Sequence, residues 1–260
     1  MKYIYSLLLP LGVFLLTGCA PLPIVNSSPD TIKENSIYKY YDSKSQIRYL
    51  VSNDDKNLHI SFKTVHPPTI AKILRAGLTV FFDKTGKKQK DVYVTYPIGS
   101  PEGFTSMQLN PNNQTENNVK SLINATSIAA EYGYFGDKKS FITNQSDTKI
   151  QLSLSSQSPK ELVYDLLIPF DKIDNKGKSD LFNLSIGIVT KSFNMPSSPQ
   201  KDIQVGGSGQ STGGRRPQQP GSISKDANYS GGRQMGRAPH EGFSELSEDS
   251  KIWFQVGLYR

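Results

Sequence analysis

The stretch Ile47-Arg-Tyr-Leu-Val-Ser-Asn-Asp-Asp-Lys-Asn-Leu-His-Ile-Ser-Phe62 decides the fold of this chain. Apolar residues recur at every second position on both sides of a polar cluster, namely Ile47, Tyr49 and Val51 before it and Leu58, Ile60 and Phe62 after it. A period of two is that of a strand with one buried face, and a run of Asn, Asp and Lys is typical of a turn. The stretch therefore predicts a β-hairpin with its turn at residues 53–57.

The same alternation recurs along the rest of the chain. It predicts further strands within residues 78–82, 92–96, 128–135, 150–154, 162–168, 184–188 and 252–258. Residues 69–76 and 119–124 are expected to form short helices, the first with Thr69 as a cap and Gly77 as its stop. Many short strands without long helical patterns predict an all-β fold, an antiparallel β-sandwich of immunoglobulin-like or jelly-roll-like type.

Residues 194–250 differ from this pattern. They contain three Gly-Gly pairs in a background of Ser, Gln, Arg and Pro, which predicts a long disordered insertion. Closing a loop of this length costs roughly 2 kcal/mol more than closing a short one. Burying four large apolar side chains after it gains roughly 6–12 kcal/mol before entropy losses. We therefore expect residues 251–260 to return as the last strand, so that the sandwich comprises residues 37–193 plus 251–260.

The N-terminus has the parts of a bacterial export signal. Lys2 is the only charged residue before an apolar run at positions 7–16, which is shorter than the roughly 20 residues that span a membrane. The run ends in Leu16-Thr17-Gly18-Cys19, which resembles the lipobox of bacterial lipoproteins. The resemblance implies a signal peptide over residues 1–18 and a palmitate-type lipid anchor on Cys19. The alternative is a plain secretory signal beside an incidental cysteine.

The residues after Cys19 bear on location. Residues 19–36 are rich in Pro and polar residues and are expected to form a tether. Ala20 is not the aspartate that retains some lipoproteins in the inner membrane, so the resemblance implies the cell outer membrane, on either its periplasmic or its surface side. Asp30-Thr31-Ile32 resembles a short bacterial O-glycosylation acceptor, with an unmodified linker as the alternative. Cys19 is the only cysteine, which excludes an intramolecular disulfide.

Residues 49–62 and Gly77-Leu-Thr-Val-Phe-Phe-Asp83 resemble the opening strands of family 9 carbohydrate-binding modules and of DOMON-type domains. Leu166-Leu-Ile-Pro-Phe170 resembles a later strand end of that group. The resemblance implies a β-sandwich that binds sugar or haem. For haem, the axial ligands would come from Met107 and from His59 or His66, although His59 is expected to face solvent. For sugar, the candidates are aromatic residues on non-core strand faces: Tyr93, Tyr132, Tyr134, Trp253 and Tyr259.

Motifs for other chemistries are missing from the sequence. It contains no Gly-x-Ser-x-Gly elbow, no phosphate-binding loop and no His-Glu-x-x-His pair. Three histidines and one cysteine speak against zinc, and Asp171 is expected to cap a turn rather than to bind calcium. We therefore expect no enzyme activity and no resident cofactor or metal.

The chain has a formal net charge of +7. Residues 201–238, within the Gly-rich segment, hold six Lys or Arg and two Asp, and we expect this part to be a solvated loop rather than a nucleic-acid site. The expected function is a lipid-anchored, non-catalytic binding or scaffold protein of the cell envelope. Its partners would be the membrane, through the lipid on Cys19, and a carbohydrate or envelope protein. The alternative is a haem- or sugar-binding module that serves a partner enzyme.

Lipidation at Cys19 is directly testable. Cells grown with an alkyne palmitate analogue should label the mature protein, because the thiol is the only acceptor that the lipobox provides. The variant Cys19→Ser should remain unlabelled and should keep its leader. A labelled Cys19→Ser protein, or an unlabelled mature parent, would remove the anchor.

Overall fold

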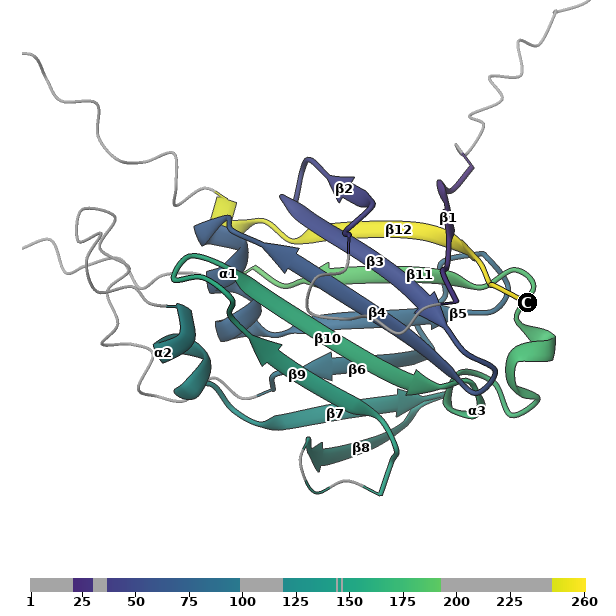
Figure 1. Cartoon of the computed structure of the whole chain (residues 1–260). Coiled ribbons are helices and arrows are strands. Elements are labelled where there is room, and N and C mark those ends of the chain that lie inside the picture. Colours follow the sequence, from purple (N-terminus) through teal and green to yellow (C-terminus); the bar gives the residue numbers. More distant parts are fainter. Residues whose placement is uncertain (1–20, 30–36, 99–118, 144, 146, 193–244) are drawn as a thin grey trace, which may run out of the picture.

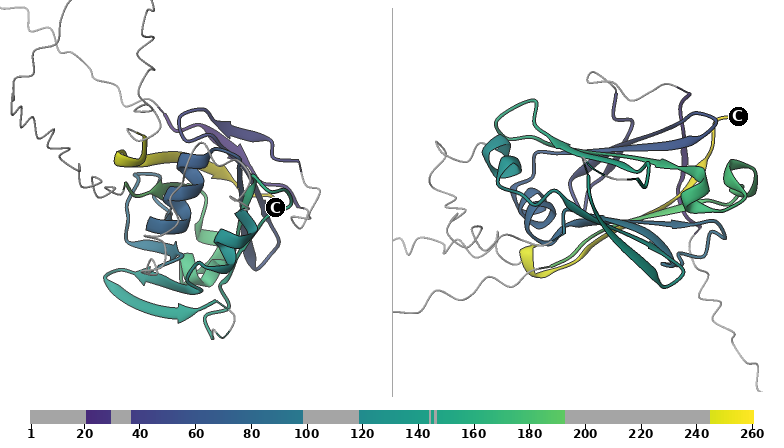
Figure 2. Two further views of the ribbon diagram at one scale, coloured as in Figure 1. Left: turned by 90° about the vertical axis from the view of Figure 1, so that its left-hand side faces the viewer. Right: turned by 90° about the horizontal axis from the view of Figure 1, so that it is seen from below.

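The computed structural model describes residues 21–29, 37–98, 119–143, 145, 147–192 and 245–260. Two β-sheets pack face to face, with α1 and α2 at one end of the sandwich and α3 at the other (Figure 1). The view from below separates the two layers (Figure 2). The expected signal peptide, Cys19, Met107 and residues 194–244 of the expected insertion lie outside the described residues.

The larger sheet has seven strands. Its spatial order is β1 (Ile24–Asn26), β12 (Ser250–Gly257), β11 (Ser185–Thr190), β5 (Leu78–Asp83), β6 (Val92–Tyr96), β7 (Ala129–Tyr134) and β8 (Asp137–Ile142). All neighbouring pairs are antiparallel except β1 and β12, which run parallel. The last strand of the chain therefore lies between β1 and β11, inside the sheet.

The smaller sheet has five strands and contains the hairpin that the sequence predicts. Its order is β2 (Tyr40–Asp42), β3 (Ile47–Asn53), β4 (Asn57–Thr64), β10 (Leu162–Pro169) and β9 (Gln151–Ser155). In the hairpin, Tyr49 pairs with Phe62 and Val51 pairs with Ile60, so the predicted apolar positions share one face. The helical elements are α1 (Pro67–Ala76), α2 (Val119–Asn124), α3 (Phe170–Ile173), and the 3-10 turns η2 (Gly177–Asp180) and η3 (Glu245–Ser247).

The core lies between the two sheets. Its largest fully buried side chains include Tyr164, Phe62, Phe82 and Phe254. Phe254 on β12 stacks on Tyr49 of the opposite sheet, with ring centroids 4.9 Å apart. Alternation along most of the strands delivers an apolar face to this space, which confirms the all-β, two-sheet architecture.

Three local expectations are wrong. Residues 24–26, expected in the tether, form β1, because Val25 fills an inward position and pairs with Val256. β1 is an edge strand, where one side of the backbone has no partner strand. The neighbouring prolines, which lack an N–H, are therefore tolerated there. Helix α1 begins two residues before Thr69, because Pro67 and Pro68 suit a first turn whose N–H groups need no partner. Thr69 instead donates its hydroxyl to the Ser45 carbonyl oxygen at 2.7 Å.

Other elements carry a weak signal in the sequence. The sequence does not predict β2 and β8, because Tyr40–Asp42 has only three residues and Asp137–Ile142 is largely polar and exposed. Asp171, expected to cap a turn, lies in the first turn of α3, where Pro169 occupies the N-cap. Gly77 does end α1, and its N–H donates to the Ile73 carbonyl oxygen at 3.0 Å.

The packing of β12 against the opposite sheet gives a prediction for the stability of the protein. Phe254→Ala should lower the free energy of unfolding by about 3–5 kcal/mol, because it leaves a cavity between the sheets. Its neighbour Gln255 points to the other face, so Gln255→Ala should cost about 0.5 kcal/mol or less. Urea unfolding followed by circular dichroism measures both values. Equal costs for the two variants would show that β12 does not contribute its inner face to the core.

Candidate functional site

The outer face of the seven-stranded sheet carries a row of three aromatic side chains, which we call the aromatic row: Trp253, Phe81 and Tyr93. The strand register places them side by side. Phe81 of β5 lies opposite Tyr93 of β6 on one side and opposite Gly187 of β11 on the other, and Gly187 lies opposite Trp253 of β12. All three are partly exposed. Because their strand neighbours Phe254, Phe82 and Val92 point into the core, the row faces away from it.

Two glycines set the orientation of the outer rings. A Cβ added to Gly187 would lie 2.4 Å from Cζ2 of Trp253, and one added to Gly133 would lie 2.1 Å from Cε1 of Tyr93. In both cases three atoms of the ring lie within 3 Å of the added Cβ. The Trp253 ring therefore covers Gly187, the Tyr93 ring covers Gly133, and both lie along the sheet surface. A glycine inside a strand weakens it unless another group needs the space, and here the rings do.

The rings in the row contact one another. The Trp253 and Phe81 rings are nearly parallel, at 14° with centroids 6.2 Å apart, and the Phe81 and Tyr93 rings are tilted at 55° and 5.8 Å apart. Lys90 places its Nζ 5.5 Å from the Phe81 centroid, within the range of a cation–π interaction. The contacts hold the three rings as one continuous apolar surface.

Polar groups border this surface. The Tyr93 hydroxyl donates to Oε1 of Glu131 at 2.7 Å. Burial, and then this hydrogen bond and the negative charge of Glu131, raise the pKa of Tyr93 to about 12, so the phenol stays protonated at neutral pH. The hydroxyls of Thr79 and Thr95 lie 2.9 Å apart on the same face. The outer face therefore combines an aromatic strip with hydroxyl and carboxylate groups beside it.

The five aromatic residues expected to bind sugar do not form one surface. Tyr93 and Trp253 lie on the outer face, as expected. The expectation that Tyr132 and Tyr134 lie on a non-core face is wrong. They lie opposite Val94 and Val92 and pack against the core. The Tyr132 hydroxyl donates to the Lys172 carbonyl oxygen at 2.6 Å, and burial is the main cause that raises the pKa of Tyr132 to about 12.

Tyr259 lies beyond the end of β12 and is half exposed. Its backbone N–H donates to the side-chain oxygens of Ser27 and Asn53, at 2.7 and 2.9 Å. These contacts place it at the β1 end of the molecule and outside the aromatic row. Its role there is to tie the C-terminus to the N-terminal strand.

The sequence reasoning missed Phe81, the central member of the row. Its signal was present: it lies between the core positions Val80 and Phe82, so alternation places it on the outer face. Gly133 and Gly187, each in a strand and each one position from an inward residue, were a second signal. A glycine in the middle of an apolar strand marks a close approach by another group.

The residues named as haem ligands are not brought together in the described structure. His59 lies on the outer face of the five-stranded sheet but is half buried, contrary to the expected solvent exposure, and its Nδ1 has no hydrogen-bond partner. His66 lies at the start of α1, where Nδ1 is 3.0 Å from the Thr69 hydroxyl and Nε2 is 3.2 Å from Oε2 of Glu245. Among the described residues, no group of three or more His, Cys, Asp or Glu side chains is placed to hold a metal ion.

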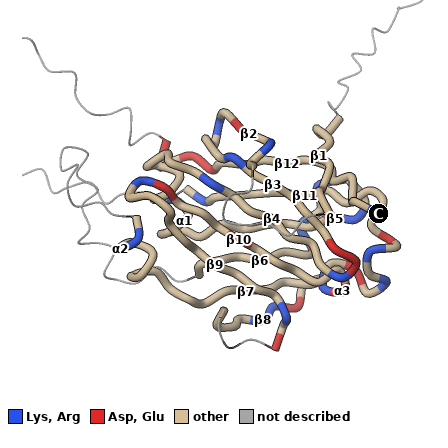
Figure 3. The backbone as a smooth tube through the Cα atoms, viewed as in Figure 1, with Lys and Arg blue, Asp and Glu red and all other residues tan. Residues whose placement is uncertain are grey.

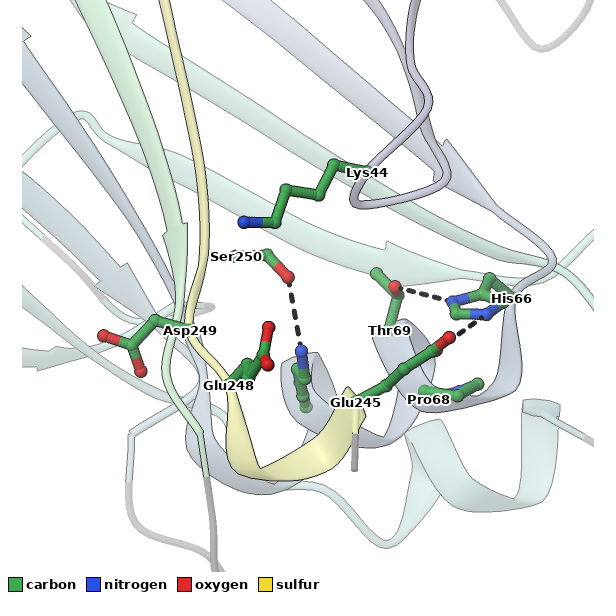
Figure 4. A pocket seen from close by; sticks show the side chains of 9 residues that line it. Lys44, His66, Pro68, Thr69, Glu245, Glu248, Asp249 and Ser250 are labelled. Carbon is green, nitrogen blue, oxygen red and sulfur yellow. Dashed lines mark hydrogen bonds and ion pairs between the residues drawn. The ribbon is translucent and has the colours of Figure 1, made fainter. Parts of the chain in front are cut away.

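A charged pocket of about 200 Å³ lies between α1 and the segment that leads into β12 (Figure 4). Lys72 lines it, is only 4% exposed and donates from Nζ to the Ser250 hydroxyl at 3.2 Å. Burial lowers the pKa of Lys72, and the carboxylates of Glu245, Glu248 and Asp249 partly oppose that effect. The ammonium of Lys72 belongs to α1, and the carboxylates belong to the segment before β12. Their attraction therefore links the start of β12 to α1.

Comparison with known proteins adds no relative. No protein-family model matches the chain, and no curated protein matches it. Within the described part of the chain, no helix has the length and apolar character needed to cross a membrane.

The packing of Trp253 on Gly187 gives a second prediction. Gly187→Ala should destabilise the protein by about 1–3 kcal/mol, because its methyl group occupies the space of the indole ring. In a Trp253→Ala background the same change should cost less than about 0.5 kcal/mol, since the ring is gone. Urea unfolding by circular dichroism completes the double-mutant cycle. A cost of Gly187→Ala that is the same in both backgrounds would mean that the ring does not cover the glycine.

Proposed function

We propose that this protein is a lipid-anchored protein of the cell envelope that binds carbohydrate, without catalysis, through the aromatic row. The observation that carries the proposal is the orientation of Trp253 and Tyr93, whose rings are laid along the sheet by glycines beneath them. A ring held in this way presents its face to a ligand. The faces of pyranose rings carry C–H groups, which pack against aromatic faces.

The size and setting of the row favour an extended glycan. The three rings span four neighbouring strands, β12, β11, β5 and β6, and offer stacking positions to more than one sugar unit. Glu131 and Thr95, both partly exposed beside the row, supply acceptors and a donor for sugar hydroxyls. A mostly apolar surface with a few placed polar groups is the usual arrangement for orienting a ligand. If the rings only stabilised the sheet by covering the glycines, they would not need to be accessible to solvent. All three rings are partly exposed, which favours a binding role.

The anchor completes the proposal. The lipobox resemblance at residues 16–19 supports a lipid on Cys19 and residence at the outer membrane, and two or more acyl chains give stable attachment. The sandwich is expected to be of jelly-roll or immunoglobulin type, with the Gly-rich segment as a disordered insertion. No observation on the described residues favours the haem alternative. The protein would thus hold a glycan, or an envelope partner that carries one, at the membrane surface.

Removal of one ring tests the proposal. On a glycan array, the parent chain should bind a defined set of glycans, and Trp253→Ala and Phe81→Ala should each weaken that binding about tenfold or more, because each removes a stacking face. Phe182→Ala is the matched control, since Phe182 is an exposed aromatic residue outside the row. No binding by the parent, or an equal loss in the Phe182 variant, would contradict a glycan platform on this face.

A further inference from the structure

We propose that the glycan bound by the aromatic row is anionic, with carboxylate, sulfate or phosphate groups recognised by the lysines of the β5–β6 turn. This inference deepens the proposed function and rests on it. The turn follows β5 as Lys84-Thr-Gly-Lys87-Lys88-Gln-Lys90 and leads into β6. It therefore lies between the two strands that carry Phe81 and Tyr93. We call Lys87, Lys88 and Lys90 the turn lysines.

Lys90 links the turn to the row directly. Its Nζ lies 5.5 Å from the centre of the Phe81 ring, so an anionic group on a sugar stacked over Phe81 comes within a few ångströms of an ammonium. Lys87 and Lys88 are exposed on the same turn. The Debye length is about 8–10 Å at ordinary ionic strength. An ammonium group closer than this to a bound anionic group is only partly screened by salt.

The turn is shaped in advance by a buried carboxylate. Asp83, the last residue of β5, accepts hydrogen bonds from the Thr85 N–H at 2.8 Å, the Thr85 hydroxyl at 2.7 Å and the Gln89 N–H at 3.1 Å. Burial alone would raise the pKa of Asp83, but the donated hydrogen bonds hold it below its ordinary value, so the group is ionised. A fixed turn presents its lysines without a further ordering cost.

The turn lysines differ from the other lysine of the turn. Lys84 is committed to Asp174 and Asp180 near α3 and η2. Among the described residues, the turn lysines form no ion pair with a carboxylate. The nearby acids are Asp91, which follows the turn, and Glu131, which accepts the Tyr93 hydroxyl. Among the described residues, Lys87 and Lys88 therefore stand beside the row without an ionic partner, and Lys90 lies over the Phe81 ring.

The far edge of the row is also basic. Lys138 of β8 lies opposite Gly133, the residue that the Tyr93 ring covers, and is exposed. Figure 3 shows that the strand centres are mostly uncharged, whereas Lys, Arg, Asp and Glu gather at the turns and along β8. The row thus runs between basic positions at its turn end and at its β8 side, a pattern that complements a chain of repeated negative charges.

A membrane of anionic lipid is the competing partner for a basic, aromatic surface. The orientation of the rings favours the glycan. Membrane-inserting aromatics project from a surface, whereas Trp253 and Tyr93 lie along the sheet and cover Gly187 and Gly133. The faces of the rings, and not their edges, are offered to the ligand.

The test compares polymers that share one backbone and differ in charge. The full chain, purified in detergent, is run in affinity electrophoresis against polygalacturonate and its methyl ester, and against carboxymethyl cellulose and hydroxyethyl cellulose. We expect at least one anionic polymer to bind about tenfold or more tightly than its neutral counterpart at low salt. The preference should fall steeply as the salt is raised towards about 0.5 M, where screening becomes short-ranged.

Two charge-matched triple variants assign the effect. Lys87→Gln, Lys88→Gln and Lys90→Gln together should abolish the preference for the anionic polymer. Lys39→Gln, Lys56→Gln and Lys160→Gln remove the same charge from exposed positions elsewhere and should leave the preference intact. Unchanged fluorescence of Trp253, the only tryptophan, shows that each variant is folded.

Each other outcome has a defined meaning. Equal binding of charged and neutral polymers that Trp253→Ala abolishes would overturn the charge inference and leave the proposed function standing. A preference that survives in the turn-lysine variant would also overturn the inference. Binding of neither polymer pair would overturn the charge inference and leave the proposed function to the glycan array, whereas binding that Trp253→Ala leaves unchanged would overturn both. Binding to phosphatidylserine vesicles in place of the polymers would identify the surface as a membrane contact and overturn both as well.

Discussion

The stacking of Phe254 on Tyr49 joins the two sheets, and the strand that carries Phe254 joins the two ends of the chain. β12 pairs with β11 on one side and with β1 on the other, and the backbone of Gly257 accepts the N–H of Ser27 at 2.9 Å. The sandwich therefore closes only when β12 has paired with both neighbours. The buried ammonium of Lys72, bound to the Ser250 hydroxyl, secures the start of the same strand.

The same strand connects the core to the candidate site. Side chains alternate across a sheet, so Phe254 directed inward places Trp253 outward, over Gly187 of the neighbouring strand. A register shift by one residue would exchange the two faces and would remove both the core contact and the aromatic row. The packing of the core thus determines which side chains reach the outer face, and the glycines beneath Trp253 and Tyr93 determine how those two rings lie.

The charged groups form a buried set and an exposed set, and the two sets have different roles. Asp83 and Lys72 are buried, and each is satisfied by specific hydrogen bonds that shape a turn or hold a strand. The turn lysines lie at the surface, where their charges remain available to a ligand. Burial is costly for a charge unless it is paired or hydrogen-bonded, so the partners of Asp83 and Lys72 are part of the fold.

The sequence by itself determined the two-sheet architecture and most strands, including the hairpin at 47–62 and the return of the last strand, because alternation at a period of two is local and strong. It also placed Tyr93 and Trp253 outward. Only the tertiary structure decided that Tyr132 and Tyr134 face the core, that Phe81 joins the row, and that residues 24–26 form β1. Those outcomes depend on which strands become neighbours and in which register, and pairing across long separations leaves no mark on a short stretch of chain.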